Sequence, residues 1–560
     1  MKTRESKYFF GIKLLIIFGA ALVFTVLSLT IAFPAEEDAF IYYRYALNWA
    51  QGRGLVFNPG ERVEGYSSPL WMAILAFSAT SGLHLPEYAP LLGIACGALT
   101  VMGTYFLSCY LGLGSFSKVA VISGLAVFYP FIVWSRSGIE TPLYSLSIVA
   151  FTSFYLAERT SVSASKNIPL WPQFIGGIGI AFIALCRPEG ILIIFPVAVD
   201  RLCWNKDRSG FLRYLIPAVL IYGIFLAWRY TTYGSLTPNT SVKIHPDYLK
   251  RSLTQILSYF AYLGGIILII PIMRFVFPQH QNSQTDHYRL SFLSLIVFFL
   301  AIFYTLAVGG DYRPHFRFLV PLTPLVLVIF WKCYETSGIE TRRWLNRFPA
   351  IMIRFVILIS IVLLSIISIV KNYSDQKTPV FSILENTFAD SHNYHNIAAQ
   401  WIIEHVPTEK TVAFGQMGKA PYYSMIAGKD IRFIDTLGLV DREIGKIYRF
   451  DNLIRIFLGE IFSGESLKRA AEKGREKLAV KSSEYIISRR PDFIIIESIF
   501  ANSLRIQTLL SNRRFRRRYT FIEEIISGGK PLFLVYAKKP PVLNFDSGIN
   551  TTRRNFKPPS

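Results

Sequence analysis

The sequence is dominated by a succession of apolar segments between Ile12 and Val370, separated by short breaks that hold charged residues, proline or glycine. About 20 apolar residues cross a bilayer as a helix, so these segments predict about 11 transmembrane helices. Only 17% of the residues are charged, against roughly 25% in soluble proteins. We therefore expect a multi-pass α-helical membrane protein. The expected spans are 12–33, 88–111, 117–134, 141–157, 173–186, 189–202, 211–230, 254–275, 289–308, 316–333 and 351–371.

Three apolar segments need an interpretation of their own. The first span is longer than the apolar core of a signal peptide, so we expect it to be retained. The two short segments around Arg187-Pro188 form either two spans or one long broken helix. Segment 68–82 is apolar as well, but a crossing there would put the basic residues of 201–213 outside. We expect this segment to lie along the outer surface or to re-enter it.

The basic residues indicate an orientation. If the N-terminus lies inside, the inside loops carry more basic than acidic residues, most clearly in 201–213 and 332–347, whereas the outer loops are balanced. Lysine and arginine favour the cytoplasmic side, so this orientation is expected. An odd number of spans then puts the residues after Val370 outside.

The composition changes after Val370. The β-branched runs 493–496 and 532–535 predict buried strands, and 391–405 predicts a helix. We expect a membrane domain over 1–371 with its first outer loop at 34–87, a soluble extracytoplasmic α/β domain over 372–540, and a flexible tail over 541–560.

Several functions lack support in the sequence. The net charge is +22, but nucleic acid binding would require that charge on one soluble face. The run 513–518 is basic, and it is better explained as a solvated face or as a contact with anionic lipid head groups or polysaccharide. The five cysteines form no CxxC pair, so no zinc or disulfide framework is indicated. Motifs for ATP binding, serine hydrolases and zinc proteases do not occur.

The first outer loop holds the strongest chemical signal. Three acids, Glu36-Glu37-Asp38, directly follow the first apolar span, and a helix with Arg44 and several tyrosines is expected after them. A carboxylate at the membrane surface is partly desolvated, which makes it a better general base. The alternative is that these acids form only a solvated collar at the end of a membrane helix.

Four further outer breaks carry cations, and three of them also carry carboxylates. They are 134–142, 187–190, 233–243 and 309–318. Each alone is better explained by a capped or paired helix end. Together they would bring arginine, lysine and carboxylate groups to one side of the membrane, which suits the handling of a lipid phosphate at the outer leaflet.

The first-loop motif resembles that of membrane-embedded glycosyltransferases of the GT-C superfamily. The resembling residues are the acidic pair 37–38, Arg44-Tyr45-Ala46 and the segment 58–66. The nearest likeness is to terminal arabinofuranosyltransferases of actinobacterial cell walls. Gly138–Pro142, Arg187–Gly190, Pro238–Thr240, Gly309–Pro321 and Gly418–Asp441 fit the same family in order. One departure is that the acidic pair of the family is usually two aspartates, whereas here it is Glu37-Asp38.

The resemblance implies a GT-C-like fold in a bacterial inner membrane and a sugar transfer from a polyprenyl-phosphate donor to a hydroxyl of a cell-envelope glycan, normally with inversion. Asp38 would be the base and Glu37 its support. The motifs fit pentose and hexose donors alike, and lipopolysaccharide, cell-wall polysaccharide or protein acceptors. Nucleic acid is not an expected partner. The residues implied in donor binding are Arg44, Arg136, Glu140, Arg187, Glu189, Asn239, Lys243, Asp311 and Arg317. Those implied in the acceptor site or its loop are Glu64, Tyr66 and Trp71.

Three alternatives stay open at this point. Arg136 either holds the donor phosphate together with Lys243 or pairs with Glu140, four residues later on the chain. A divalent cation is a possible cofactor, with Asp38 and Glu140 as its ligands. Finally, the chain could be a non-enzymatic flippase or exporter of a lipid-linked glycan, although such a path normally carries charges at mid-membrane, and most of the expected spans lack them.

Overall fold

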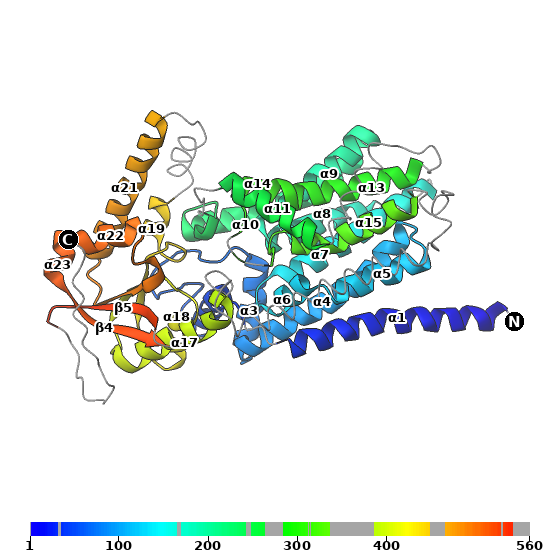
Figure 1. Ribbon diagram of the computed structural model, residues 1–560. Coiled ribbons are helices and arrows are strands. Elements are labelled where there is room, and N and C mark those ends of the chain that lie inside the picture. The colour runs from blue at the N-terminus through cyan, green and yellow to red at the C-terminus, as the bar shows by residue number, and fades with distance from the viewer. Residues whose placement is uncertain are drawn as a thin grey trace. The chain divides into compact units, whose positions relative to one another are not determined.

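The computed structural model describes residues 2–31, 35–164, 170–241, 248–263, 284–311, 313, 315–336, 386–448, 465–527 and 530–540. The chain divides into two compact units (Figure 1). Unit 1 comprises Met1–Gly52, Tyr66–Thr237 and Ile244–Ala389, and unit 2 comprises Arg53–Gly65, Pro238–Lys243 and Asp390–Ser560. Two segments that the sequence analysis gave to the membrane domain, 53–65 and 238–243, therefore belong to the C-terminal unit.

Unit 1 is built from helices. Its described α-helices are α1 (Lys2–Thr30), α2 (Glu37–Ala50), α3 (Pro69–Thr80), α4 (Leu85–Tyr110), α5 (Ser115–Ala126), α6 (Tyr129–Arg136), α7 (Thr141–Ala164), α8 (Trp171–Cys186), α9 (Ile194–Ala198), α10 (Arg208–Tyr233), α11 (Tyr248–Tyr262), α13 (Gln284–Val297), α14 (Tyr304–Val308) and α15 (Thr323–Thr336). Short 3₁₀ helices, η1 (Pro188–Ile193) and η5 (Val320–Leu322), and π-helical turns, η2 (Val199–Trp204) and η4 (Phe298–Phe303), connect them. The central helix α4 packs against α1, α5 and α7 (Figure 1).

Four helical segments of the described chain are long and apolar enough to cross a membrane. They are Gly11–Thr30, Leu85–Tyr110, Arg208–Tyr233 and Tyr288–Val308, and a bent pair, α5 with α6, would make a fifth. These segments confirm the prediction of a multi-pass helical membrane fold. The expected span 351–371 and the second half of 254–275 lie outside the described residues, so the count of about 11 stays a prediction.

Proline determines where two of the expected spans break. The expected span 117–134 is the pair α5 and α6, which meet at a 52° bend, and Pro130 occupies the first turn of α6. Helix α8 ends because Arg187 is extended (φ −153°, ψ 138°) before Pro188, as the residue before a proline prefers. Segment 68–82 becomes the 12-residue helix α3, which is too short to span a bilayer.

Unit 2 contains a five-stranded mixed sheet with the order β2-β1-β3-β5-β4. The strands are β1 (Thr411–Phe414), β2 (Arg432–Asp435), β3 (Phe493–Glu497), β4 (Tyr519–Ser527) and β5 (Lys530–Lys538). β1 pairs in parallel with β2 and β3, and β5 pairs antiparallel with β3 and β4. The helices are α17 (Asn386–His405), α18 (Lys419–Ile426), α19 (Arg442–Ile447), α21 (Glu465–Ser488), α22 (Leu504–Ser511) and α23 (Arg513–Arg518), with the short 3₁₀ helices η3 (Asn239–Ser241) and η7 (Ser498–Phe500). The strands predicted at 493–496 and 532–535 and the helix at 391–405 are confirmed.

Two asparagines attach the segments 53–65 and 238–243 to unit 2. The side chain of Asn58 pairs with the backbone of Phe433 in β2 as a strand would, donating to its carbonyl (2.7 Å) and accepting from its N–H (3.2 Å). The amide nitrogen of Asn239 donates to the carbonyls of Gly438 (2.7 Å) and Asp441 (2.9 Å). These bonds satisfy backbone groups at the edge of β2 and in the loop that follows it.

Candidate functional site

Asp38 lies in a cluster of carboxylates and arginines at the start of α2. Arg313 contacts Asp38 Oδ1 (3.1 Å) and Glu36 Oε2 (2.7 Å), and Arg317 contacts Asp38 Oδ2 (3.5 Å) and Asp311 Oδ2 (2.7 Å). The side chain of Asp38 is 25% exposed, whereas that of Glu36 is 3% exposed. Burial raises the pKa of Glu36 above its ordinary value, although Arg313 acts in the opposite direction. Asp38 is thus both held in position and open to a ligand.

The loop that carries the two arginines has an unusual backbone. Gly309 and Gly310 take positive φ angles (85° and 71°), and so do His315 (62°) and Phe316 (58°). A left-handed conformation costs non-glycine residues about 1–2 kcal/mol each. The carbonyl of His315 accepts a hydrogen bond from Trp134 Nε1 (2.8 Å), which helps to hold this conformation. Strain of this kind is common at ligand sites.

A second ion cluster surrounds Arg187 at the break after α8. Its guanidinium contacts Glu140 Oε1 (3.1 Å) and Glu189, and it lies over the ring of Tyr144 (5.7 Å). The hydroxyl of Tyr42 in α2 lies 3.5 Å from the other oxygen of Glu140. The predicted site residues Glu140, Arg187 and Glu189 therefore form one group, buried and mutually paired.

Phe318 joins the two clusters. Its ring lies 5.2 Å from the guanidinium carbon of Arg187 and 5.3 Å from that of Arg317. In addition, the backbone N–H of Glu36 donates to the carbonyl of Ser137 (2.9 Å), just before Glu140. Four of the five outer breaks recognised in the sequence, at 36–38, 134–142, 187–190 and 309–318, thus meet at one place in unit 1.

A cavity of about 370 Å³ opens beside this place. Three of its side chains are cationic, and two of these, Lys250 and Arg251, form no ion pair within the described part of the chain. Burial lowers the pKa of His315 to about 4, so this ring adds no positive charge at neutral pH. The cavity can therefore hold an anionic group next to Asp311 and Arg313. It is lined by Lys250, Arg251, Thr254, Gln255, Ser258, Asp311, Arg313, His315 and Phe316.

Arg136 does not point at the cluster of carboxylates and arginines around Asp38. Its Nη1 donates to the carbonyls of Ser28 (2.9 Å), Leu29 (2.7 Å) and Ile31 (3.2 Å), at the end of α1. These are the carbonyls that a helix leaves without internal partners, and a cation there also interacts favourably with the helix dipole. The structure thus gives Arg136 a helix-capping contact that neither of the two sequence-based alternatives included.

We expect Arg136→Gln to reduce the free energy of unfolding by about 1–2 kcal/mol, because charged hydrogen bonds to the end of α1 are lost. Binding of polyprenyl phosphate should not change. Thermal denaturation in detergent and lipid-phosphate titration measure the two effects, and Arg136→Lys should recover part of the stability. Normal stability with weakened lipid binding would instead return Arg136 to the donor site.

The other predicted residues lie elsewhere. Tyr66 and Trp71 are buried in unit 1, where the Tyr66 hydroxyl meets that of Tyr233 (3.0 Å) and Trp71 Nε1 donates to Gly138 O (3.1 Å). Arg44 and Glu37 are buried on α2. Glu64 is buried in unit 2 and its carbonyl accepts from the N–H of Asn239 (2.9 Å). Lys243 lies outside the described residues.

No role was assigned from the sequence to Arg313, Lys250 or Arg251, and Glu36 was named only as one of the three acids after the first apolar span. Arg313 lies inside the break 309–318, but nothing in the local pattern indicates its contact with Glu36, 277 positions away. Within the described residues, no three His, Cys, Asp or Glu side chains are grouped so that they could hold a metal ion. The carboxylates around Asp38 and Glu140 are paired with arginines instead.

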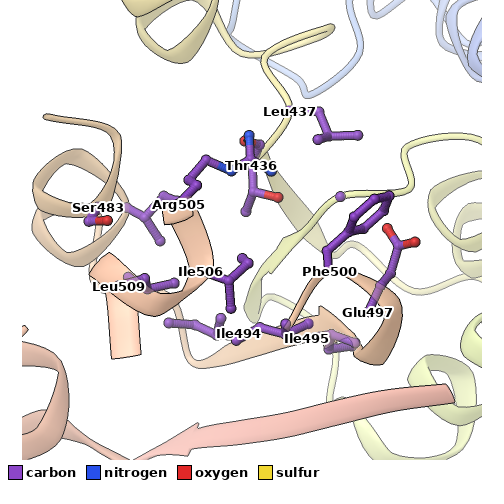
Figure 2. Close-up of a pocket in the computed structure, with 13 residues that line it drawn as sticks. Thr436, Leu437, Ser483, Ile494, Ile495, Glu497, Phe500, Arg505, Ile506 and Leu509 are labelled. Carbon is purple, nitrogen blue, oxygen red and sulfur yellow. The ribbon is translucent and has the colours of Figure 1, made fainter. Parts of the chain in front are cut away.

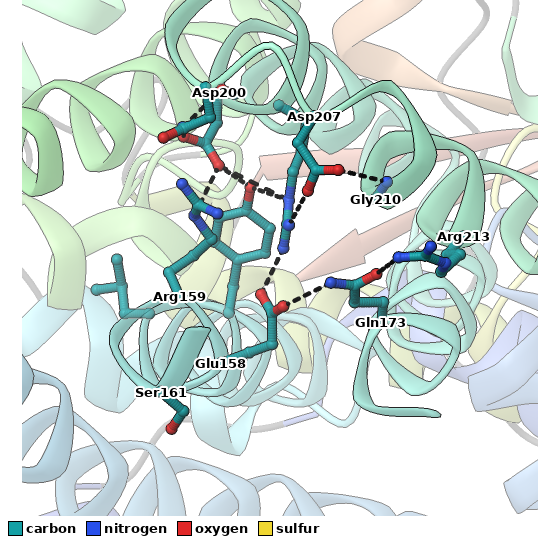
Figure 3. Close-up of polar contacts among 12 residues, drawn as sticks. Glu158, Arg159, Ser161, Gln173, Asp200, Asp207, Gly210 and Arg213 are labelled. Carbon is teal, nitrogen blue, oxygen red and sulfur yellow. Dashed lines mark hydrogen bonds and ion pairs between the residues drawn. The ribbon is translucent and has the colours of Figure 1, made fainter. Parts of the chain in front are cut away.

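A separate group of charges, which includes Glu158, Asp200 and Asp207 (Figure 3), surrounds Arg201, whose side chain is fully buried. Arg201 contacts Glu158, Asp207 (2.7 Å) and, more distantly, Asp200 (3.9 Å). Gln173 donates to Glu158 (3.0 Å). The cluster ties α7 and α8 to the start of α10, where Asp207 also caps the helix by accepting from Gly210 N–H (2.8 Å).

Unit 2 has a small cavity at the carboxyl ends of β1, β2 and β3 (Figure 2). Its volume is about 20 Å³, which is enough for one water molecule. Isoleucine and leucine side chains supply most of its wall, and Glu497 at its rim accepts hydrogen bonds from Gln416 (2.9 Å) and Tyr394 (3.2 Å). This cavity is a packing feature rather than a substrate site.

Comparison with solved structures supports a GT-C-like membrane fold for this chain. Solved structures of ArnT from Cupriavidus metallidurans are similar at 11% identity, covering 94% of this chain and 98% of that one, with TM-scores of 0.54 bound to undecaprenyl phosphate and 0.55 in the apo state. Arabinofuranosyltransferase AftD from mycobacteria matches 93% of this chain and 41% of its own, at 11% identity and a TM-score of 0.46. Residues 386–536 match a domain of unknown function, DUF8728. The comparison with curated protein sequences gave no match. At this level of identity the likeness to ArnT concerns the fold.

Proposed function

We propose that this protein is a membrane glycosyltransferase that moves one sugar from a polyprenyl-phosphate donor to a hydroxyl of a cell-envelope glycan at the outer face of the membrane. The observation that carries the proposal is a partly exposed aspartate, Asp38, held by Arg313 and Arg317 beside a cationic cavity, on a GT-C-like fold.

In the proposed reaction, the acceptor hydroxyl attacks the anomeric carbon and its proton passes to Asp38. The bond between the anomeric carbon and the phosphate oxygen breaks, and its electron pair stays on the polyprenyl phosphate. The phosphate gains one negative charge in this step, so cations placed beside it stabilise the transition state more than the ground state. Attack from the face opposite the leaving group inverts the anomeric centre.

Lys250 and Arg251 are better placed than Arg136 to bind the donor phosphate. Both line the cavity next to Asp311 and Arg313, whereas Arg136 is bonded to the end of α1. Arg187 already balances two buried carboxylates. We therefore propose that Lys250 and Arg251, rather than Arg136, bind the donor phosphate. Arg313 and Arg317 hold the base, Asp38, in position.

The double variant Lys250→Gln/Arg251→Gln should bind undecaprenyl phosphate about 10²–10⁴-fold more weakly, because two charged hydrogen bonds of roughly 1.5–3 kcal/mol each are lost. Titration of the protein in nanodiscs with the lipid measures this. The matched control is Lys206→Gln/Arg208→Gln, which removes an exposed lysine just before α10 and an exposed arginine at its first position, both in unit 1. Equal binding by both variants would contradict the assignment.

A flippase or exporter of a lipid-linked glycan is the second candidate. It would also need cations for the lipid phosphate, but it has no need for a carboxylate base. The two functions differ in one product, because only the transferase separates the sugar from its polyprenyl phosphate.

A further inference from the structure

One end of the unit 2 sheet carries a dense group of basic side chains that the proposed reaction does not use. The helix α23 (Arg513–Arg518) contributes five arginines, of which Arg513, Arg514, Arg516 and Arg517 are exposed. We call these arginines, together with Arg490, Lys538 and Lys539, the basic end of the sheet.

The packing of α23 and the pairing of β4 with β5 bring these residues together. Phe515 is 3% exposed and stacks on Tyr519 (centroids 5.1 Å apart), so the other side chains of α23 face outward. Lys538 pairs with Tyr519 in the sheet register, and the N–H of Lys539 donates to the carbonyl of Arg518 (2.9 Å).

Arg490 joins the same end through the turn that precedes β3. The hydroxyl of Tyr519 donates to the carbonyl of Pro491 (3.0 Å), next to Arg490. The neighbouring acid, Asp492, pairs with Lys410 (3.8 Å) and accepts from the N–H of Thr411 (3.0 Å). The negative charge of Asp492 is therefore already paired with Lys410. It does not neutralise the arginines of α23, so the electrostatic potential around them stays strongly positive.

The side chains around this field indicate which polyanion fits it. Single-stranded nucleic acid is bound by stacking its bases on exposed aromatic rings, but both aromatic residues here, Phe515 and Tyr519, are buried. A surface that inserts into a membrane combines basic residues with exposed apolar ones. The one apolar residue of α23 is the buried Phe515, and the exposed Ile526 lies near the other end of β4.

We propose that the basic end of the sheet binds an anionic polysaccharide, a glycan that carries carboxylate or phosphate groups along its chain. Within the proposed function, this polysaccharide is the acceptor of the sugar. Only its role as acceptor rests on the proposed function, and its binding does not. Guanidinium groups bind both kinds of anion in bidentate fashion, and several of them in a row suit a polymer better than a single small anion.

The test measures binding directly and needs no turnover, using the full-length protein in nanodiscs of zwitterionic lipid. Polygalacturonate should bind, with affinity that falls steeply as salt rises, and neutral dextran should not bind. Arg513→Gln/Arg514→Gln/Arg517→Gln should weaken polygalacturonate binding by about 10-fold or more and flatten the salt dependence. The corresponding triple change to glutamate should abolish binding.

The matched control removes the same charge from α21, where Lys473, Lys477 and Lys481 are interleaved with glutamates. The triple variant of these lysines to glutamine should bind polygalacturonate as the wild type does, and thermal denaturation should be unchanged for both glutamine variants.

The proposal is overturned if the α23 variant binds polygalacturonate as tightly as the wild type, or if the wild type does not bind it. It is also overturned if only oligothymidylate binds, or if only phosphatidylglycerol in the nanodisc protects 513–518 from hydrogen exchange. Failure to release polyprenyl phosphate would reject the proposed function but leave this binding result standing.

Discussion

Asp38→Asn should reduce sugar transfer by about 10²–10⁴-fold while leaving expression and lipid binding close to normal. Asparagine keeps the size of the side chain, and its one amide oxygen can still accept from Arg313, which contacts Asp38 at 3.1 Å, although it loses the weaker contact with Arg317 at 3.5 Å. It cannot accept the proton of the acceptor hydroxyl. Turnover of a polyprenyl-phosphate sugar by purified protein measures the loss, and a lipid titration checks that the donor site is intact.

The neighbouring acids provide matched comparisons. Glu37→Gln should have a smaller effect than Asp38→Asn. Glu36→Gln should have an intermediate one, because Glu36 shares Arg313 with Asp38 and so positions it. Glu87, whose side chain is 79% exposed on α4, is the control that should not matter when changed to glutamine. Full activity of Asp38→Asn with an inactive Glu37→Gln would reverse the assignment of the base.

Arg201→Met should reduce the free energy of unfolding by about 3–5 kcal/mol, the largest stability effect we expect. The arginine is fully buried and contacts Glu158 and Asp207, with Asp200 close by. Its removal leaves the buried Glu158 without its cation, and takes one partner from Asp207, which is 29% exposed, and from Asp200, which keeps Arg159 (3.4 Å). Thermal denaturation in detergent, at one scan rate for all variants, measures the loss as a lower melting temperature.

A double variant separates the charge effect from a packing effect. Arg201→Met/Glu158→Leu removes both partners of one buried pair, so it should be more stable than Arg201→Met alone. The control Arg208→Gln removes an exposed arginine from the same region and should leave the melting temperature unchanged. If Arg201→Met is as stable as the wild type, the buried cluster does not hold α7, α8 and α10 together.

The local elements of this fold were predictable from the sequence. Apolar length identified the long helices α1, α4 and α10, proline identified the break at Arg187-Pro188 but not the bend between α5 and α6, and β-branched runs identified β3 and β5. These features depend on neighbouring residues, which a sequence pattern displays directly. The sequence also led us to expect that the five outer breaks would group, and four of them do so in unit 1.

The partners within that group were not predictable. Arg313 meets Glu36 from 277 positions away, and such a pairing follows from helix packing rather than from spacing. Tyr66 and Trp71 belong to a motif with a functional resemblance, yet both are buried and bonded within unit 1. Asn239, expected at the donor, binds backbone carbonyls of unit 2. Each of these polar side chains makes a hydrogen bond within the protein. A sequence pattern does not distinguish a side chain that stabilises the fold from one that binds a ligand.

The central claim is that this protein separates a sugar from a polyprenyl phosphate. Mass spectrometry of the lipids after incubation of the purified protein in nanodiscs, with a polyprenyl-phosphate sugar and a cell-envelope glycan extract, tests it directly. We expect the amount of free polyprenyl phosphate to rise together with the amount of sugar added to the glycan. With Asp38→Asn we expect neither product. Transport of the intact lipid-linked sugar across the bilayer without release of polyprenyl phosphate, equal for the wild type and Asp38→Asn, would contradict it.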